Sequence, residues 1–514
     1  ASQWRYLGRS MPRLDMVDKV TGTAEYGIDV RRPGMRFATV RMSPRLGGDM
    51  LSHDAAEAEA MPGVERVIDL GTGIAVVARN TWLAMRAADA VTIEWGPAPY
   101  PETSDALMEV IRGALDDEPN SMLRDEGDAD RMQVDPADRV IEAEYTVPWL
   151  AHATMEPMSA AAHHTGDRLE IWTGSQAPGF AAAAAAEAVG LDPEQVTCHV
   201  TYLGGGFGRR GEHDFAVLAA RIAHEMEGTP VQVTWSREED MRHDYYRPAA
   251  AARMRGVLRN GFAHGLEGRV AAPSVTRQSM QRLTGNAPPG PDKGHVEGMF
   301  NQPYAIPNYR VTGHLAELSV PVGFWRSVGN SFNGFFMESF VDELAVAGGR
   351  DPLGFRLELA RNEHAPTAGV LEAVAEMSGW SAPRGAGTGM GVAMTHSFHT
   401  PVAVVVEVAD RDGAIALTRA WIACDVGTAL DPAIVESQMV SGFVFGASAA
   451  MMQEISFSGG EVEQWNYPDF DALRMTQMPR VEVRIRETQA HMRGVGEPST
   501  PPAMPALANA VYDL

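Results

Sequence analysis

The sequence contains only two cysteines, Cys198 and Cys424, among its 514 residues. It has no Cys-x-x-Cys pair and no set of four cysteines, which excludes an iron–sulfur cluster and a cysteine-ligated zinc in this chain. Both cysteines fall in apolar, strand-like runs, where free buried thiols are expected, although a disulfide between them remains open. Any redox role must therefore pass electrons to another protein or molecule.

Basic residues are also in deficit, since 43 Lys and Arg stand against 67 Asp and Glu, a formal net charge of -24 at pH 7. This balance excludes a nucleic-acid partner, whose phosphates would be repelled. No run of about 18 apolar residues occurs, so the sequence predicts no transmembrane segment. The opening residues, Ala1-Ser2-Gln3-Trp4, do not resemble a signal peptide.

Metal-ligating and nucleotide-binding motifs are missing as well. His163 and His164 are adjacent and would face opposite sides of a strand, while His152 and His213 stand in no His-Glu-x-x-His spacing. The chain has no P-loop and no Gly-x-Gly-x-x-Gly fingerprint. We therefore expect no metal held by protein side chains.

The length and the order of patterns predict several α+β units. A chain of 514 residues exceeds one ordinary core. Residues 1–125 are predicted to form a small α/β domain that ends in a connector, with the Pro- and acid-rich stretch 95–138 on the surface. Longer strands and helices follow in two successive blocks, residues 139–380 and 387–514.

Several local signals are specific. Strands are predicted at residues 64–70, 74–78 and 91–95, with a helix capped by Asn80 before the last of them. In the second block, residues 402–409 and 414–424 are predicted to pair through the turn Asp410-Arg411-Asp412-Gly413. Asp431-Pro432 is typical of a helix start. A further helix is predicted at about residues 506–512.

The most informative segment is the loop Gly204-Gly205-Gly206-Phe207-Gly208-Arg209-Arg210. It follows a strand-like run, residues 195–203, and precedes an amphipathic helical run. Glycines allow positive φ and a close approach to a ligand, and amides at such a turn form an anion-binding concavity. Arg209 and Arg210 would add positive charge. The simpler alternative is a tight turn with solvated arginines.

Two further loops carry polar side chains suited to a site. Glu497 lies in Gly494-Val495-Gly496-Glu497-Pro498 and could act as a general base if its pocket is partly dry, or could be a solvated loop acid. Gln176 ends another strand, and its amide can donate and accept hydrogen bonds. Alone, it would be an ordinary loop contact.

Aromatic and small residues give weaker signals. Phe324, Trp325 and Arg326 lie beside glycines before a helical run, where they could offer stacking faces and a cation. Gln438, Gly442 and Gly446 are spaced by four on the helix after Asp431. Small residues so spaced allow a close neighbour, either a cofactor or another helix.

Taken together, the segments resemble the molybdenum-binding subunit of the xanthine dehydrogenase/aldehyde oxidase family. Within it, the resemblance is to the branch of isoquinoline 1-oxidoreductase beta subunits and periplasmic aldehyde dehydrogenases. The matching segments occur in family order over nearly the whole chain: residues 20–30, 204–210, 325–338 and 425–427, Gln438, and residues 494–498, 501–502 and 506–510.

The resemblance implies a molybdopterin cofactor, in its cytosine dinucleotide form, whose dithiolene holds the molybdenum. Catalytic roles are implied for Glu497 as the base, Gln176 as the partner of the apical oxo ligand, and Phe207 beside the metal. The implied cofactor-binding residues are Gly204, Gly205, Gly206, Phe207, Gly208, Arg209, Arg326, Gln438, Gly494, Val495 and Gly496. Trp325 and Phe324 are the implied substrate contacts.

The implied reaction is a hydroxylation with oxygen from water. The substrate is expected to be an N-heteroaromatic compound or an aldehyde, and electrons are expected to pass to a small [2Fe-2S] subunit. A cytochrome c subunit and a periplasmic location are further expectations of this branch. Relatives normally carry a Gly-Gln-Gly segment upstream of Gly8. A separate polypeptide is the expected source of it here, and the alternatives are a segment that was cleaved or one that lies outside this chain.

Two alternatives remain at this stage. The chain could be a non-catalytic half of a split subunit that only completes the cofactor pocket. A hydrolase built on Glu497 would need a second acid, and none stands at a meaningful spacing in the sequence.

Overall fold

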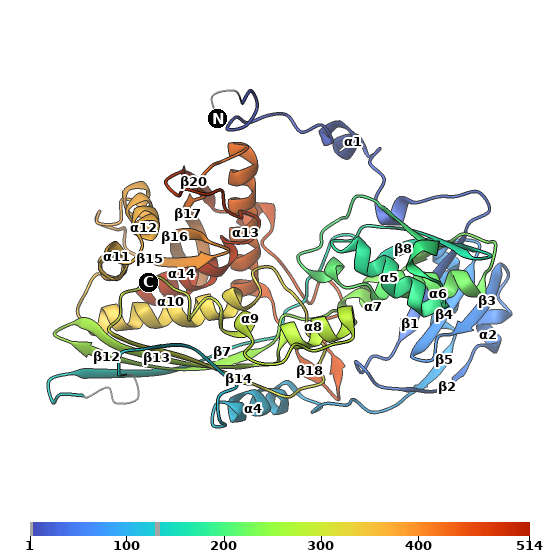
Figure 1. Cartoon of the computed structure of the whole chain (residues 1–514), viewed down its shortest axis with the longest axis horizontal. Helices are drawn as coiled ribbons and strands as arrows, with labels where there is room; N and C mark the ends of the chain where they lie inside the picture. Colours follow the sequence, from blue (N-terminus) through green and yellow to red (C-terminus); the bar gives the residue numbers. More distant parts are fainter. Residues whose placement is uncertain (1–3, 129–133) are drawn as a thin grey trace.

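The structure, a computed structural model, describes residues 4–128 and 134–514. Residues 1–3, which include most of the opening segment considered above, and 129–133 lie outside the described part. Helices and sheets occur throughout, in agreement with the predicted α+β class. Two lobes lie side by side, one coloured blue to green and the other mainly yellow-green to red, with the blue-to-teal segments around α4 and β7 at its base (Figure 1).

The first lobe is built on a seven-stranded sheet. In spatial order its strands are β10 (Val196–Val200), β9 (Arg168–Thr173), β8 (Ser159–Thr165), β11 (Val231–Thr234), β1 (Arg36–Met42), β4 (Gly73–Ala78) and β3 (Val64–Asp69). The helices of this lobe are α2 (Ala56–Glu59), α3 (Thr81–Asp89), α5 (Pro178–Val189), α6 (Asp214–Glu225) and α7 (Arg237–Arg242). A two-stranded sheet pairs β2 (Met50–Asp54) with β5 (Thr92–Trp95).

This sheet joins segments that the sequence assigned to different domains. β1, β3 and β4 come from the predicted N-terminal unit, and β8 to β11 come from the predicted cofactor-binding block. They pair because β1 lies between β4 and β11 and hydrogen-bonds to both. Strands from both sides of the boundary predicted between residues 125 and 139 therefore pair within one sheet.

The second lobe begins with a five-stranded sheet. Its strands, in spatial order, are β6 (Ser121–Glu126), β14 (Asn308–Leu315), β13 (Phe262–Ala272), β12 (Ala250–Arg259) and β7 (Arg139–Val147). The long helix α10 (Gly329–Ala347) covers one face and α4 (Ser104–Ala114) lies on the other (Figure 1). The shorter helices α8 (Val275–Thr284) and α9 (Lys293–Val296) lie near the start of α10.

The stretch predicted as a surface connector is more ordered than expected. It contains β6 and the helix α4, in which Leu107 and Ile111 are fully buried. Thr103 caps this helix by accepting a hydrogen bond from the Ala106 amide at 3.3 Å. The proline- and acid-rich composition concealed an amphipathic helix that packs on the five-stranded sheet.

A four-stranded sheet lies above α10. Its strands are β15 (Thr388–Ser397), β16 (Thr400–Arg411), β17 (Ala414–Asp425) and β20 (Arg480–Arg486). The helices around it are α11 (Pro352–Arg361), α12 (Ala365–Ser378), α13 (Pro432–Met452) and α14 (Thr500–Asp513). The remaining elements are α1 (Met16–Thr21), β18 (Phe457–Ser458), β19 (Glu461–Val462) and short 3-10 turns at Gly27–Asp29, Pro193–Gln195, Arg209–Gly211 and Met475–Gln477.

Local predictions in both lobes are confirmed. The side chain of Asn80 accepts the Leu83 amide at 2.8 Å at the start of α3. β16 and β17 pair through the predicted turn, in which Asp412 and Gly413 have φ of 58° and 84°. Both cysteines are free thiols.

α13 is, among the described residues, the one helix long and apolar enough by length and composition to cross a membrane. In the structure it packs as a core helix, with Met439 and Phe443 fully buried. A Cβ added at Gly442 would lie 2.1 Å from Ser499 Oγ, and one at Gly446 would lie 2.6 Å from the Thr500 carbonyl oxygen. The close neighbour indicated by the glycine spacing is therefore the start of α14.

Candidate active site

The glycine loop connects β10 to α6, and its backbone is held against two side chains. The Gly204 amide donates to Glu156 at 2.7 Å, and the Gly208 amide donates to the side-chain oxygen of Gln176 at 3.1 Å. A Cβ at Gly206 would lie 2.4 Å from that same oxygen. At Gly208, where φ is 112°, a Cβ would lie 1.4 Å from the Phe324 carbonyl oxygen. Only glycine allows both approaches.

The structure brings Gln176 to the loop, as the resemblance implies. Its backbone amide donates to the Arg210 carbonyl at 2.9 Å, and its side chain is exposed. The loop uses the side-chain oxygen of Gln176, so the amide nitrogen is the group left to donate to a ligand.

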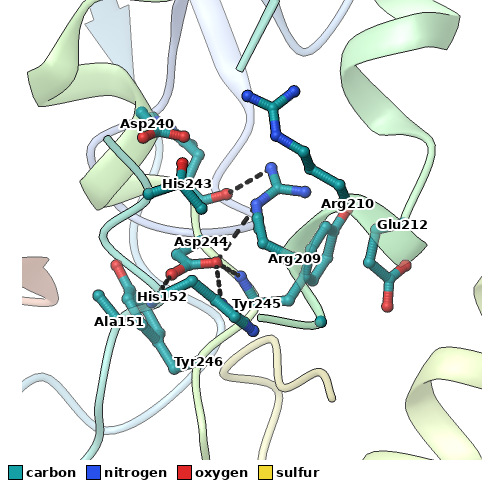
Figure 2. Close-up of polar contacts among 12 residues, drawn as sticks. Ala151, His152, Arg209, Arg210, Glu212, Asp240, His243, Asp244, Tyr245 and Tyr246 are labelled. Carbon is teal, nitrogen blue, oxygen red and sulfur yellow. Dashed lines mark hydrogen bonds and ion pairs between the residues drawn. The ribbon is translucent and has the colours of Figure 1, made fainter. Parts of the chain in front are cut away.

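Arg209 and Arg210 differ from the expectation of charges offered to an anion. Arg209 is 1% exposed and donates twice to Asp214 at 2.8 Å. It also lies 3.2 Å from Asp244 (Figure 2). Asp244 in turn accepts from the ring of His152 at 2.8 Å. Burial alone would lower the pKa of Arg209, but these two carboxylates outweigh it and raise the pKa above its usual value.

Arg210 is fully buried and holds the loop through carbonyl groups. It donates to the Gly205 carbonyl at 2.9 Å and to the Glu156 carboxylate at 3.0 Å. Glu156 also accepts the Ile28 amide at 3.0 Å, which ties the loop to the N-terminal segment. Because a buried guanidinium must be paired, both arginines point toward protein carboxylates and carbonyls. They therefore stabilise the loop from the protein side. Glu156, Asp214 and Asp244 were not singled out from the sequence.

Phe207 lies in a stack of three rings. It has φ of 56°, and its ring lies 4.7 Å from that of Phe445, which in turn lies 4.6 Å from Trp325. Phe445 belongs to α13, so this stack joins the glycine loop of the first lobe to a helix of the second. Phe445 was not singled out from the sequence, where it is one of many apolar residues on the same helix.

Trp325 was expected to face substrate, and its burial argues otherwise. The ring is 1% exposed, and its N–H donates to the Ala151 carbonyl at 3.2 Å. One face is covered by Phe445. We therefore correct the prediction: Trp325 supports the stack, whereas its neighbour Phe324 is only half-buried.

Arg326 hydrogen-bonds to α13 and to the loop that contains Glu497. It donates to the Gly496 carbonyl at 2.9 Å, to Gln438 at 3.2 Å and to the Ser441 hydroxyl at 3.1 Å. Burial lowers its pKa, and the charge of Glu497 acts in the opposite direction. Arg326, Gln438 and Gly496, which are far apart in the sequence, therefore meet as the resemblance implies.

Glu497 is fixed by the segment that follows Arg326. One of its carboxylate oxygens accepts the Ser327 amide at 3.0 Å, and its carbonyl accepts the Ser327 hydroxyl at 2.9 Å. The side chain is half-buried. The loop before it is held at Gly494, whose carbonyl accepts the Thr400 hydroxyl at 2.7 Å, and Val495 packs on the core beneath the four-stranded sheet.

Backbone strain concentrates in these segments. Of the eight non-glycine residues with positive φ in the described part, five are Phe207, Ser327, Val328, Phe398 and His399. Val328 is β-branched, with φ of 48°, which makes it a genuine outlier. The last two form the tip of the β15–β16 hairpin, where a Cβ at Gly494 would lie 3.7 Å from that of Phe398. Such clustering is typical of a functional site.

A second acid, Glu297, lies near the strained turn at Ser327 and Val328 and was missed from the sequence. It is half-buried between α9 and α10. Burial, and then the charge of Glu497, raise its pKa to about 8. The two acids are 200 residues apart in the chain, which is why a search at short spacing does not find the pair.

The residues present fit a molybdopterin. No group of three His, Cys, Asp or Glu side chains is placed to hold a metal within residues 4–128 and 134–514. What the segments offer instead are glycine backbones, the Gln176 amide and Arg326. This donor set suits a metal carried by its own organic ligand.

Comparison with known proteins supports the same conclusion. Residues 115–359 and 358–479 match two families described as Molybdopterin cofactor-binding domain. The chain is 33% identical to the isoquinoline 1-oxidoreductase subunit beta of Brevundimonas diminuta, over 99% of this chain and 67% of that protein. It belongs to the xanthine dehydrogenase family as a molybdenum-binding subunit.

Two further comparisons extend this result. The membrane-bound aldehyde dehydrogenase (pyrroloquinoline-quinone) of Gluconacetobacter polyoxogenes is 27% identical over all of this chain and 71% of that protein. The crystal structure of quinoline 2-oxidoreductase from Pseudomonas putida 86 superposes with a TM-score of 0.84 at 15% identity, covering 99% of this chain and 95% of that one. The second likeness concerns the fold. As a member of the family, this molybdenum-binding subunit is part of a molybdenum-dependent oxidoreductase that binds molybdopterin.

Proposed function

We propose that this subunit is catalytic and adds water-derived oxygen either to a carbon beside a ring nitrogen or to an aldehyde carbon. The observation that carries the proposal is the placement of Glu497. Its carboxylate is held by the Ser327 amide at 3.0 Å, beside Arg326, where the glycine loop and α13 meet. A half-buried carboxylate fixed in this way is suited to take a proton.

Some residues of the site would bind the cofactor, and Glu497 would transfer the proton. Bound molybdopterin would supply the two-electron acceptor and activate the oxygen. Gln176 and the amides of the glycine loop would hold its oxo and pterin groups, and Arg326 with Gln438 would orient it from the other lobe. Because Ser327 occupies one oxygen of Glu497, the other oxygen is the proton acceptor. Phe207 would cover the site and exclude water.

The finer features of the assembly belong to the same proposal. The cofactor is proposed to be the cytosine dinucleotide form, and the first electron acceptor a small [2Fe-2S] subunit. A periplasmic location and a cytochrome c subunit are proposed on the resemblance to the branch. A Gly-Gln-Gly segment, wherever it is encoded, would complete the cofactor site.

The alternative is a non-catalytic role, in which the chain only completes a pocket built by other residues. The two differ in where the base comes from. If the chain is only a scaffold, removing Glu497 leaves turnover in the complex unchanged.

The test is cofactor and substrate analysis of the native complex. We expect molybdenum, iron, and CMP released by acid hydrolysis, together with oxidation of ring-nitrogen compounds or aldehydes that incorporates oxygen from labelled water. Molybdenum should be measured on the complex and on the isolated chain, since retention by the isolated chain contradicts the scaffold role. A complex that contains a quinone cofactor and no molybdenum would falsify the proposal.

A further inference from the structure

Glu297 and Glu497 gather at the N-terminus of one helix. Glu497 accepts the Ser327 amide at 3.0 Å, and a Cβ at Gly329 would lie 3.3 Å from Glu297 Cγ. Ser327 and Gly329 are two residues apart, so their Cα atoms are at most about 7 Å apart. The two side chains therefore reach adjacent positions of one strained turn, Glu497 at Ser327 and Glu297 at Gly329, from segments that lie on either side of it in the sequence.

The backbone of Glu297 is firmly held. Asn333, which is fully buried, donates to the carbonyls of His295 and Glu297 at 2.9 Å each. The Glu297 amide donates to the Lys293 carbonyl at 3.0 Å. The next residue, Gly298, has φ of 91°, and a Cβ there would lie 2.7 Å from Asn330 Cα. The backbone from which the Glu297 side chain extends is therefore fixed.

The charges around Glu297 favour its neutral form. Asp292 and His295 flank it on α9, Glu497 faces it from the loop before α14, and no cation lies within ion-pair distance of it in the described part. The nearby Arg326 is occupied by Gly496 and Gln438. Burial raises the pKa of Glu297 to about 8, with Glu497 and then Asp292 adding to the effect, while the Gly329 amide and the Asn330 side chain oppose it.

The side chain of Asn330 contacts Glu297 and acts against the raised pKa, because its hydrogen bond favours the ionised carboxylate. Asn330 is 1% exposed, and its Oδ1 has no hydrogen-bond partner among the described residues.

We propose that Glu297 is the substrate-orienting acid of the site, a neutral carboxyl group that donates a hydrogen bond to the heteroatom beside the reacting carbon. This inference rests on the proposed function. Glu497 accepts a proton while Glu297 keeps its own, so the pair divides between two roles because two like charges so close cannot both ionise readily.

The chemistry selects a class of substrate. A ring nitrogen and an aldehyde oxygen each carry a lone pair one bond from the carbon that is attacked. Negative charge grows on that heteroatom as oxygen adds, and a donor aimed at it stabilises the transition state. Substrates that lack the lone pair lose this contact, and substrates with a carboxylate at this position are repelled by the ionised Glu497.

The alternative is that Glu297 merely caps α10 as a carboxylate, since an anion at a helix N-terminus is stabilising. The two roles differ in protonation. A helix cap would be ionised at neutral pH and would not affect substrate binding. The orienting acid is protonated and donates a hydrogen bond to the lone pair of the substrate.

The experiment uses the intact complex with Glu297→Gln, Glu297→Ala and Glu497→Gln, and with Glu317→Gln as a control at an exposed acid on the same lobe. Infrared difference spectra across pH report the carbonyl stretch of a protonated carboxyl group. We expect this band to vanish near pH 8, to be missing in Glu297→Gln, and to titrate at lower pH in Glu497→Gln, which lacks the neighbouring charge. The control should keep the wild-type titration.

Binding and kinetic measurements distinguish a hydrogen-bond donor at residue 297 from a charged group there. Wild type and Glu297→Gln should bind isoquinoline at least about tenfold more tightly than naphthalene, because glutamine keeps an N–H donor, and Glu297→Ala should lose the preference. kcat/KM should fall about tenfold per pH unit above 8 in wild type and stay level there in Glu297→Gln. An ionised Glu297 at pH 6, or equal discrimination in all variants, overturns the inference. An enzyme without molybdenum-dependent turnover refutes the proposed function instead, and the band and the binding preference still report on Glu297.

Discussion

The two sides of the site are held in opposite ways. On the glycine-loop side, Arg209 is enclosed by Asp214 and Asp244, and Arg210 meets Glu156, so buried charges are matched. On the α10 side, two acids share one turn with a single arginine that is bound mainly to neutral groups. The first side is electrostatically satisfied, and the second is not.

This difference separates positioning from reactivity. A matched ion-pair network is rigid, and its charged groups keep their protonation states. It therefore suits a loop that must hold a cofactor. An unmatched pair of acids, held by strained backbone at Ser327 and Val328, has protonation states that respond to its surroundings. We therefore expect substitutions on the first side to cost stability and substitutions on the second to cost turnover.

The largest expected effect is on turnover. Glu497→Gln keeps the hydrogen bond from Ser327 but cannot take a proton, so kcat should fall by about 10²- to 10⁴-fold. Molybdenum content should equal that of wild type. Glu317→Gln is the control, and near-normal turnover of Glu497→Gln would remove this residue from the mechanism.

Arg209→Met should give the largest loss of stability. It leaves Asp214 and Asp244 without their shared cation in a buried place, which costs about 3–5 kcal/mol. Urea denaturation followed by fluorescence measures the change. Arg86→Met breaks a surface ion pair on the same lobe and should cost about 0–1 kcal/mol. Equal losses in the two variants would contradict the matched-network interpretation.

Phe445→Leu should have an intermediate effect. It removes a ring that stacks on both Phe207 and Trp325, and each such contact contributes about 0.5–1.5 kcal/mol. Because the stack joins the lobes, cofactor retention should fall together with the unfolding midpoint. Phe262→Leu, at an exposed ring, is the matched control, and unchanged retention would argue against a role for the stack in the site.

The smallest expected effect is the pH dependence of stability. Between the ordinary pKa of a glutamate, 4.5, and about 8, the unfolded chain ionises at Glu297 while the folded chain keeps the proton. The unfolded state thus binds fewer protons, and this group makes the folded state less favoured as pH rises through that range. Solvent screening of a half-buried side chain reduces the size of the effect.

Comparing wild type with Glu297→Gln at pH 5, 6.5 and 8 isolates this contribution. The difference in free energy of unfolding should grow in favour of the variant as pH increases. A difference that is constant across the series would mean that Glu297 ionises normally in the folded protein.

Local patterns accounted for much of the fold. The Asn80 cap, the turn at Asp412-Gly413 and the helix start at Asp431 depend on neighbouring residues alone, and each is present. The helix α4 was missed because proline and acid content around it suggested a connector. The shared seven-stranded sheet was missed because pairing of β1 with β11 depends on contacts nearly 200 residues apart.

The candidate site shows the same division. The resemblance assigned Gln176, the glycine loop, Arg326 and Gln438 to one cofactor site, and the structure brings Gln176 to the loop and Arg326 to Gln438. It could not show that Trp325 is buried, because a tryptophan beside glycines looks alike whether it faces a ligand or a core.

The family, the glycine loop and the acid in residues 494–498 could be predicted because they depend on residue identity in a fixed order. The inward direction of Arg209 and the approach of Glu297 to the turn that binds Glu497 became evident only from the packing. Burial and the distances between charges determine whether a side chain is ionised, paired or reactive, and both arise from the packing of segments distant in the chain.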